Sequence, residues 1–502
     1  MNRTPNKNVL LTAFVVGTLL VLILIQITFN VTVAYKGMVF PFGDLTGISS
    51  ASECIQAGLN PYLENPIDPL GREFNYPPIW LYVSDFLHFD GKDVVPVGLT
   101  LIFLFTLTTC FLFKAKNVKQ CLIFLTFFFS PPVLLLLERG NSDGVLFMLV
   151  AFMTVYLPKI RRLNPQARLY TSAVIILISS LLKLYPLVLL PLLIIEPVSL
   201  RKRITVMICT GLLILGYLIC SLDIITLITH NTPQPLIMAY GKNVLLEKFF
   251  PDELISVVSN GLIVLVIIAV ILLNSKGKGF ISKLYPSDTT TNETILPFIA
   301  GVLIFAGTFV IGNNYIYRLV FLLLTLPYLL DQLTLLEASR EESPIPKRNP
   351  VFYSLTPPRA AGNALAKFRH HAVSVSSENS LLAACLLLMV VYGTGALDFL
   401  SSDIWRVIDW CMVGILPILL LLSLIPCFRK NNEKRSVEWM SLLTILQCWM
   451  LLLTFYGYRM GEFFIFWYAI MGLACWGLLL SFLVASVHYL IHHFTPTPAR
   501  PL

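Results

Sequence analysis

Long apolar runs alternate with short polar islands along nearly the whole chain. Runs suited to crossing about 30 Å of hydrocarbon occur at 9–34, 94–113, 120–137, 144–158, 203–222, 259–273, 294–312, 319–330, 380–396, 405–426, 439–455 and 463–489. The sequence lacks the ten-residue alternation of a membrane β-barrel, and the run at 262–273 is continuously apolar. The pattern therefore predicts an all-α fold, a polytopic transmembrane helix bundle.

The stretch 169–196 is an apolar segment of a different kind. It is too short for two full crossings, yet basic residues flank it at both ends. Lys183 and Pro186 interrupt it, and proline removes an amide donor and disfavours helix at the residue before it. We expect a pair of short helices that enters the membrane and returns. With this pair the sequence predicts about 12–14 membrane segments.

Composition and charge fix the class and the orientation. The chain has 502 residues, of which 56% are hydrophobic and only 13% charged, which excludes a soluble globular protein. Basic residues prefer the cytoplasmic side, and they fall there if both termini are cytoplasmic. The same asymmetry explains the net charge of +8, so no nucleic-acid partner is expected. We predict a multi-pass protein of the cell inner (cytoplasmic) membrane, with an uncleaved first helix.

Three regions follow from this pattern. Residues 1–330 are expected to form a transmembrane core with an extracytoplasmic loop at 35–93, followed by a polar, flexible cytoplasmic insert at 331–379 and C-terminal transmembrane helices at 380–502. Within the acidic first loop, 45–57 can form a short amphipathic helix with Asp44 at its N-cap. A turn follows at 58–62, and an aromatic stretch at 73–82 is suited to the membrane interface.

The polar islands share one property: by this topology they all face outward. A charged group near the bilayer core costs about 2.5–3.5 kcal/mol, so a gathering of charges on one rim of a bundle favours a functional site. The residues singled out are Asp44, Tyr76, Arg139, Asn141, Asp143, Lys183, Tyr185, Asn314, Tyr315 and Arg318.

The order of the motifs carries a family resemblance. An Asp follows the first membrane helix, and after it come Gly-x-x-Pro-Tyr at 58–62, Tyr-Pro-Pro at 76–78, Arg-Gly-Asn-x-Asp at 139–143, Lys-x-Tyr-Pro at 183–186 and Asn-Tyr-Ile-Tyr-Arg at 314–318. Together they resemble the GT-C glycosyltransferases, most closely glycosyltransferase family 87, the bacterial polyprenyl-phosphate-dependent mannosyltransferase-like membrane proteins. The resemblance covers residues 10–330 and leaves the later segments without a motif.

The resemblance implies a polyprenyl-phosphate sugar donor and a glycan or glycolipid acceptor on the extracytoplasmic face, with inversion at the anomeric carbon and mannose as the family's commonest sugar. Asp44 matches the family's general base. Arg139, Lys183 and Arg318 are the cations available to the phosphate. The other outward polar residues are expected to line the same donor site, in contact with membrane lipids. No cofactor and no metal are expected.

Each key residue also has a structural interpretation. Asp44 is either the base or only a helix cap, with Glu53 and Asp68 as substitutes for the base. Arg139 and Arg318 can instead anchor helix ends at the interface. Lys183 needs an anionic partner, which is a phosphate or a buried carboxylate.

Two other functional classes stay open. A secondary transporter or flippase would also use a broken hairpin with buried charge, and a lipid-linked-oligosaccharide polymerase or ligase would also have many helices and outward arginines. His230, in the loop 223–258, is expected to be solvated. The His pairs at 370–371 and 492–493 lack the further ligands of a metal site.

Overall fold

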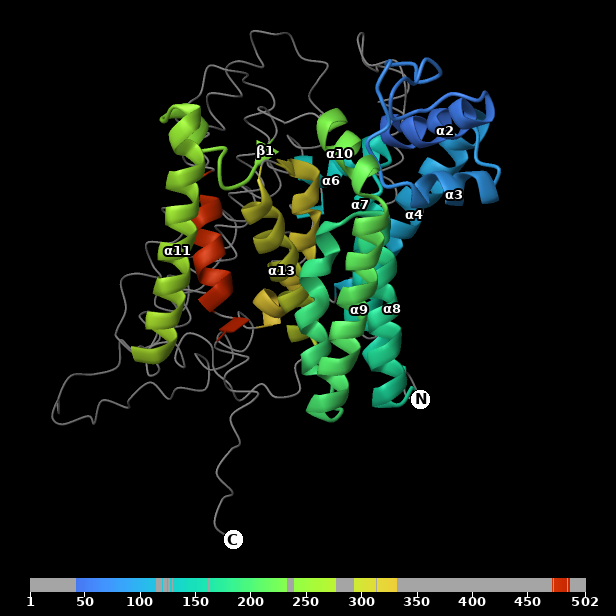
Figure 1. Ribbon diagram of the computed structural model, residues 1–502. Helices are drawn as coiled ribbons and strands as arrows, with labels where there is room; N and C mark the ends of the chain where they lie inside the picture. Colours follow the sequence, from blue (N-terminus) through green and yellow to red (C-terminus); the bar gives the residue numbers. More distant parts are fainter. Residues whose placement is uncertain are drawn as a thin grey trace, which may run out of the picture.

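The computed structural model describes residues 42–113, 120, 124, 127–128, 130–160, 163–232, 239–276, 293–312, 314–331, 472, 474–484 and 486–487. Within them the chain is mostly helical (Figure 1). Four helices of this part are long and apolar enough to cross a membrane, or up to five if a bent pair counts as one span. These features are those of a helical membrane protein. The expected segments at 9–34, 380–396, 405–426 and 439–455, and the insert, lie outside the described residues.

The elements follow one another from the first loop to the core. The helices and strands are α2 (Gly43–Gln56), α3 (Ile79–Phe86), η1 (Gly91–Asp93), α4 (Val94–Leu112), α6 (Pro131–Arg139), α7 (Asp143–Ala151), η2 (Phe152–Tyr156), η3 (Leu157–Lys159), α8 (Pro165–Leu182), η4 (Tyr185–Ile195), α9 (Leu200–Cys220), α10 (Leu222–Asn231), β1 (Ala239–Tyr240), η5 (Leu246–Lys248), α11 (Asp252–Lys276), α13 (Ile295–Ile311), β2 (Asn314–Tyr315) and η6 (Ile316–Thr325). The mostly helical structure agrees with the expected all-α fold, and among the described residues a two-stranded antiparallel ladder of β1 and β2, with two residues in each strand, is the short exception.

The bundle has two distinct ends. Helices α2, α3 and α10 lie at one end, called here the Asp44 end, while α8 begins and α9 begins at the other (Figure 1). At this second end, called the basic end, Lys159 pairs with Glu293 at 3.1 Å and Arg168 with Glu196 at 2.5 Å. The loops expected to face outward and those expected to face inward therefore lie at opposite ends.

The apolar stretch around Lys183 is broken as expected, but its two arms are unequal. Asn164 accepts a hydrogen bond from the amide of Ala167 at 2.7 Å, and α8 then runs for 18 residues to an extended Lys183. The expectation of two short helices is therefore wrong for α8, which is long enough to cross. The return arm η4 is an 11-residue 3₁₀ helix, and the steeper rise of that helix carries it roughly 22 Å. Lys183 thus sits where the two arms meet.

Helices α6 and α7 meet at a sharp corner of 113°. Gly140 ends α6 in the left-handed conformation (φ 58°), and its amide and that of Asn141 bond back to the carbonyls of Leu137 and Leu136. A Cβ at position 140 would also lie 2.8 Å from Leu45 on α2. Glycine is therefore required here both for the backbone angle and for the close approach of α2.

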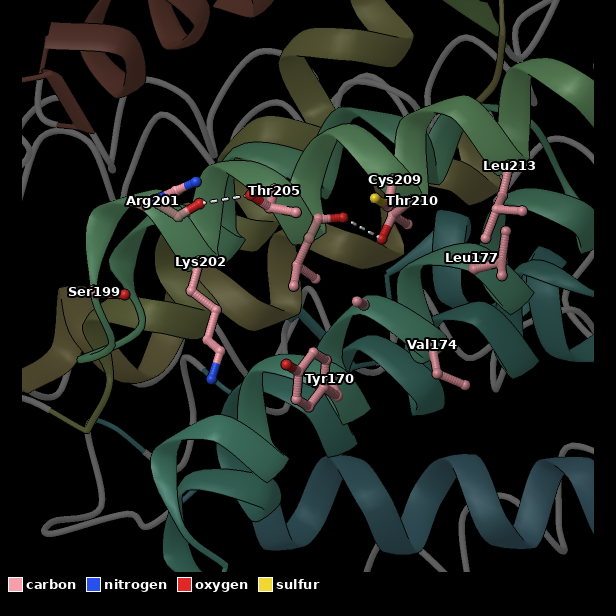
Figure 2. A pocket seen from close by; sticks show the side chains of 12 residues that line it. Tyr170, Val174, Leu177, Ser199, Arg201, Lys202, Thr205, Cys209, Thr210 and Leu213 are labelled. Atoms are coloured by element: carbon pink, nitrogen blue, oxygen red, sulfur yellow. Dashed lines mark hydrogen bonds between the residues drawn. The ribbon is translucent and has the colours of Figure 1, made fainter.

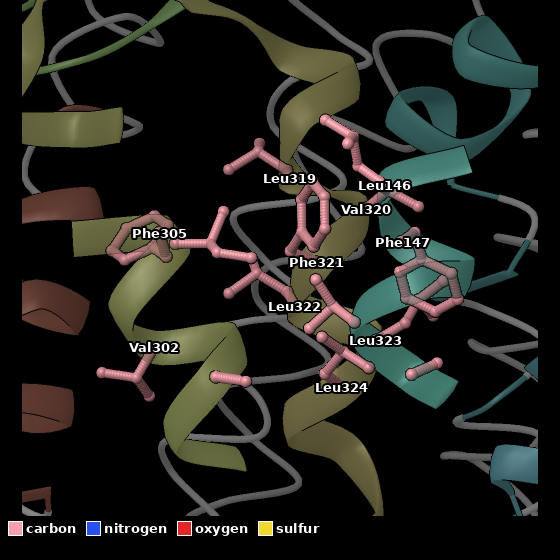
Figure 3. Close-up of a cluster of buried hydrophobic side chains, with 14 of the residues drawn as sticks. Leu146, Phe147, Val302, Phe305, Leu319, Val320, Phe321, Leu322, Leu323 and Leu324 are labelled. Atoms are coloured by element: carbon pink, nitrogen blue, oxygen red, sulfur yellow. The ribbon is translucent and has the colours of Figure 1, made fainter. Parts of the chain in front are cut away.

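The hydrophobic core lies between α7, α13 and η6, where Phe147, Phe305 and Phe321 are fully or almost fully buried (Figure 3). Close backbone approach needs small residues, and a Cβ on Gly301 of α13 would lie 2.8 Å from the carbonyl oxygen of Phe321. The C-terminal helix Ala474–Val484 joins this core through Phe482, whose ring lies 6.0 Å from that of Phe305. By contrast, Thr210 and Ile214 are the only buried residues of α9 within the part of the chain that the structure describes, as expected of a helix that faces lipid.

Candidate functional site

Asp44 lies in the first turn of α2, one residue after the helix begins. The position before the helix is Phe42, whose backbone is left-handed (φ 59°) and whose side chain makes no cap. Its amide donates to the carbonyl of Glu138 at 3.0 Å, and a Cβ on Gly98 would lie 2.5 Å from its ring. The expectation that Asp44 caps the helix is therefore wrong. The packing of Phe42 against residues distant in sequence determines where α2 begins. The carboxylate of Asp44 does not cap the helix and can bind other partners.

The carboxylate of Asp44 is held by residues from α6 and the corner that follows. Arg139 donates from Nη2 to Oδ1 at 2.6 Å and from Nε to both oxygens at 3.1 Å. Asn141 donates from Nδ2 to Oδ2 at 2.5 Å. Arg139 is thus not merely an interfacial anchor, because its guanidinium forms a two-pronged ion pair across 95 residues of sequence.

Arg72 is a second cation at this carboxylate, and sequence reasoning missed it. Its Nη1 lies 3.9 Å from Asp44, while its Nη2 pairs with Asp68 at 2.9 Å and donates to the carbonyl of Gly43 at 2.7 Å. The available signal was the spacing of Asp68 and Arg72, four residues apart in a polar loop. Of the two substitutes for Asp44, Asp68 lies at the edge of the site. Glu53 lies elsewhere and accepts from the amide of Gly91 at 2.8 Å.

Asn141 connects this half of the site to a second one. Its Nδ2 faces Asp44, and its Oδ1 accepts from Nζ of Lys183 at 3.0 Å and from the amide of Asp143 at 2.9 Å. Tyr76 lies beside it, with its hydroxyl oxygen 3.4 Å from Nδ2. The partners on the two sides fix the orientation of the amide, since only one end of an amide donates.

The second half centres on Asp143, which is fully buried at the start of α7. Nζ of Lys183 lies 2.5 Å from its Oδ1, and the hydroxyl of Tyr185 donates to the same oxygen at 2.9 Å. Nε of Arg318 lies 3.7 Å from Oδ2. Lys183 therefore has the buried carboxylate partner that its position requires.

Aromatic faces surround the cations. Nζ of Lys183 lies 5.3 Å from the ring centre of Tyr76 and 5.8 Å from that of Tyr317, and Arg318 lies 5.1 Å from the ring centre of Tyr185. Burial, followed by the nearby charge of Asp44, raises the pKa of Tyr76 well above its ordinary value. Tyr76 therefore keeps its proton, while its oxygen accepts from Nδ2 of Asn141. Tyr317 was not among the expected site residues.

The last two expected residues come from strand β2. Asn314 donates from Nδ2 to the carbonyl of Thr308 at 2.5 Å and accepts a short hydrogen bond from Nη1 of Arg318. Tyr315 pairs with Ala239 in the ladder and stacks on Tyr317, with ring centres 5.4 Å apart. The structure thus brings nine of the ten expected residues into one network of hydrogen bonds and ion pairs, and Tyr315 contacts it by stacking.

The remaining candidates lie apart from this network. His230 is exposed on α10 and so lies on a helix, not in a loop. Among the described residues no three His, Cys, Asp or Glu side chains gather as metal ligands. The His pairs at 370–371 and 492–493 lie outside the described residues.

No known protein-family model, characterised protein or solved structure matches this chain. A function for it therefore rests on the geometry of the polar network and on the motif resemblance.

Proposed function

We propose that this protein is a glycosyltransferase of the cytoplasmic membrane, active on the extracytoplasmic side. It moves a sugar from a polyprenyl-phosphate donor to a glycan or glycolipid acceptor, with Asp44 as general base. The observation that carries the proposal is the network itself: at one end of an apolar bundle, two buried carboxylates, Asp44 and Asp143, are paired with four cations drawn from four separate segments.

The charge of the network suits such a donor. Four cations meet three carboxylates, so one positive charge is left over; the side chains are Arg72, Arg139, Lys183 and Arg318 against Asp44, Asp68 and Asp143. A sugar phosphodiester carries a single negative charge, which would make the occupied site neutral. Burial of unbalanced charge is unfavourable, and the excess cation therefore favours a monoanionic ligand.

Arg139 has two possible partners in this scheme. Its guanidinium bonds to both oxygens of Asp44, at which the proton of an acceptor would have to be received. A donor phosphate bound beside Asp44 would compete for the same guanidinium. When Arg139 turns to the phosphate, Asp44 keeps Asn141 as a partner and has an oxygen free to receive the proton of the acceptor. Donor binding would thus prepare the base for the acceptor.

The sugar is then transferred in one displacement step. The acceptor hydroxyl gives its proton to Asp44, and its oxygen forms a bond to the anomeric carbon of the sugar. On the opposite face, the bond from that carbon to the phosphate oxygen breaks, and the polyprenyl phosphate leaves with the electron pair. Arg139 and Arg318 would stabilise the negative charge that develops on the leaving phosphate.

The test uses the full-length protein in lipid nanodiscs with radiolabelled polyprenyl-phosphate mannose and an envelope glycolipid extract. Asp44→Asn should lower transfer about 10²–10⁴-fold, because it removes the base. Glu53→Gln is the matched control, since this carboxylate lies on the same helix but binds the amide of Gly91 outside the network. Wild-type turnover in Asp44→Asn, with sugar transfer present, would exclude Asp44 as the base.

A secondary transporter or flippase is the second candidate. It is favoured by the buried pair of Asp143 and Lys183 at a break between two helical arms, an arrangement that transporters use for bound ions or anionic substrates. Counterflow of an anionic solute or a lipid-linked sugar in proteoliposomes, without transfer of label to an acceptor, would support this candidate over the enzyme.

A further inference from the structure

The basic end carries a groove that the proposed transfer does not use. It lies between α8 and α9, has a volume of about 680 Å³ and is open along one side (Figure 2). Tyr170, Val174 and Leu177 line it from α8, and Lys202, Cys209 and Leu213 from α9. None of these residues belongs to the Asp44 network.

The walls of the groove are apolar even where threonines face it. The hydroxyl of Thr205 donates to the carbonyl of Arg201 at 2.9 Å, and that of Thr210 to the carbonyl of Val206 at 2.8 Å (Figure 2). Both donors are thus engaged within α9 itself. What remains toward the groove is hydrocarbon, which suits an alkyl chain and not a polar solute.

The mouth of the groove is cationic. Arg201 and Lys202 line it, and within the part of the chain that the structure describes neither forms an ion pair. Figure 2 shows Lys202 extending toward Tyr170. Helix α9 begins at Leu200 with no side-chain cap from Ser199, so its first amides add positive potential at the same place.

The length of the groove matches one leaflet of a bilayer. From Ser199 to Leu213 it follows α9 for roughly 20 Å at about 1.5 Å per residue. Half of a hydrocarbon core is about 15 Å, which leaves about 5 Å for a headgroup region. Cations at the mouth and apolar walls below therefore fit the amphipathic outline of a membrane lipid.

We propose that the groove between α8 and α9 binds an anionic phospholipid, with its phosphate against Arg201 and Lys202 and an acyl chain along α9 as far as Leu213. Basic pockets between transmembrane helices bind anionic headgroups in this way. The occupant is a lipid of the leaflet at the basic end. The site is independent of the proposed transferase activity, and its cationic mouth lies at the opposite end of the bundle from the Asp44 network (Figure 1).

The first experiment measures lipid retention. The full-length protein is reconstituted in vesicles of equal phosphatidylglycerol and phosphatidylcholine, extracted in mild detergent and examined by native mass spectrometry. Retained phosphatidylglycerol should exceed phosphatidylcholine by on the order of tenfold. The double variant Arg201→Gln/Lys202→Gln should lose this preference. Lys159→Gln should keep it, because Lys159 lies at the same end but pairs with Glu293 outside the groove. Equal retention of both lipids by the wild-type protein would overturn the proposal.

A second pair of variants keeps the test decisive if the double variant fails to fold. Val174→Trp fills the groove without a change in charge and should also remove the bound lipid. Replacing Tyr170 with p-azidophenylalanine should give, on illumination, a covalent adduct with phosphatidylglycerol. An adduct with another segment of the same chain would show that the protein covers the groove itself, and that result would also overturn the proposal.

Discussion

The two halves of the polar network use the same chemistry at different depths. Each is centred on one carboxylate, Asp44 or Asp143, with at least one close cation, and Asn141 joins them. The side chain of Asp143 is fully buried and that of Lys183 is 10% exposed, whereas Arg139, the partner of Asp44, is 33% exposed. The members of a fully buried ion pair stay paired with each other, whereas a residue of a partly exposed pair can exchange its partner for a ligand. Under the proposed function, this difference makes the Asp143–Lys183 pair part of the framework and the Asp44–Arg139 pair the one that meets the substrate.

The largest effect should follow from breaking the deep pair. Asp143→Asn leaves Lys183 charged and buried without its carboxylate, and loss of one member of a buried pair destabilises by about 3–5 kcal/mol. The matched change Asp44→Asn should destabilise by no more than about 1–2 kcal/mol, because the freed Arg139 can reach solvent. Thermal unfolding of both variants in nanodiscs measures the difference. Equal losses of stability in the two variants would contradict the assignment of different roles to the two halves.

The shallow pair should show its effect in kinetics. Arg139→Gln keeps a hydrogen-bond donor but removes the charge that the donor phosphate would use, so KM for the lipid-linked sugar should rise about 10–100-fold. Stability should change little, which separates this variant from Asp143→Asn. An unchanged KM would place the phosphate away from Arg139.

The corner that positions both halves can be tested with two glycines. Gly140→Ala introduces a Cβ at a left-handed residue, 2.8 Å from Leu45, and should destabilise by about 1–2 kcal/mol. Gly144→Ala, within α7 and with its nearest neighbour at 3.5 Å, is the control and should be neutral or slightly stabilising. The corner would not be under tight steric control if both variants unfolded at the same temperature.

The smallest effect is expected at the rim of the shallow half. Arg72 is 33% exposed and contacts Asp44 only at 3.9 Å, so Arg72→Gln should change stability by less than about 1 kcal/mol. A modest rise in KM should accompany it, smaller than that of Arg139→Gln. If Arg72→Gln had the larger kinetic effect, Arg72 would be the principal phosphate ligand.

The sequence was sufficient to find most of the residues that meet in the polar network, because charge inside an apolar run is unfavourable and therefore conspicuous. It was also sufficient to locate the break at Lys183, since Pro186 disfavours helix locally. Which of these residues form ion pairs or hydrogen bonds with one another could not be predicted in this way. The pairing of Asp44 with Arg139 joins residues 95 positions apart and depends on how α2 packs on α6.

The errors have the same cause. Asp44 was expected as a cap because caps are local, but α2 begins under the control of Phe42 and its bond to Glu138. The 3₁₀ geometry of η4 and η6 and the ladder of β1 with β2 also depend on neighbours far along the chain. The number of spans in the described residues is smaller than the sequence predicts for the whole chain, since several predicted segments lie outside them.

The end of α8 has a consequence for assembly of the protein. A helix that stops leaves its last carbonyls without amide partners, and that of Leu182 receives the indole N–H of Trp80 at 3.0 Å. Helix α3 is thereby fastened to an atom that is available only because α8 terminates there. A substitution that extended α8 through Lys183 would move this lysine away from Asp143. It would also break the hydrogen bond from Trp80 that fastens α3 to the end of α8.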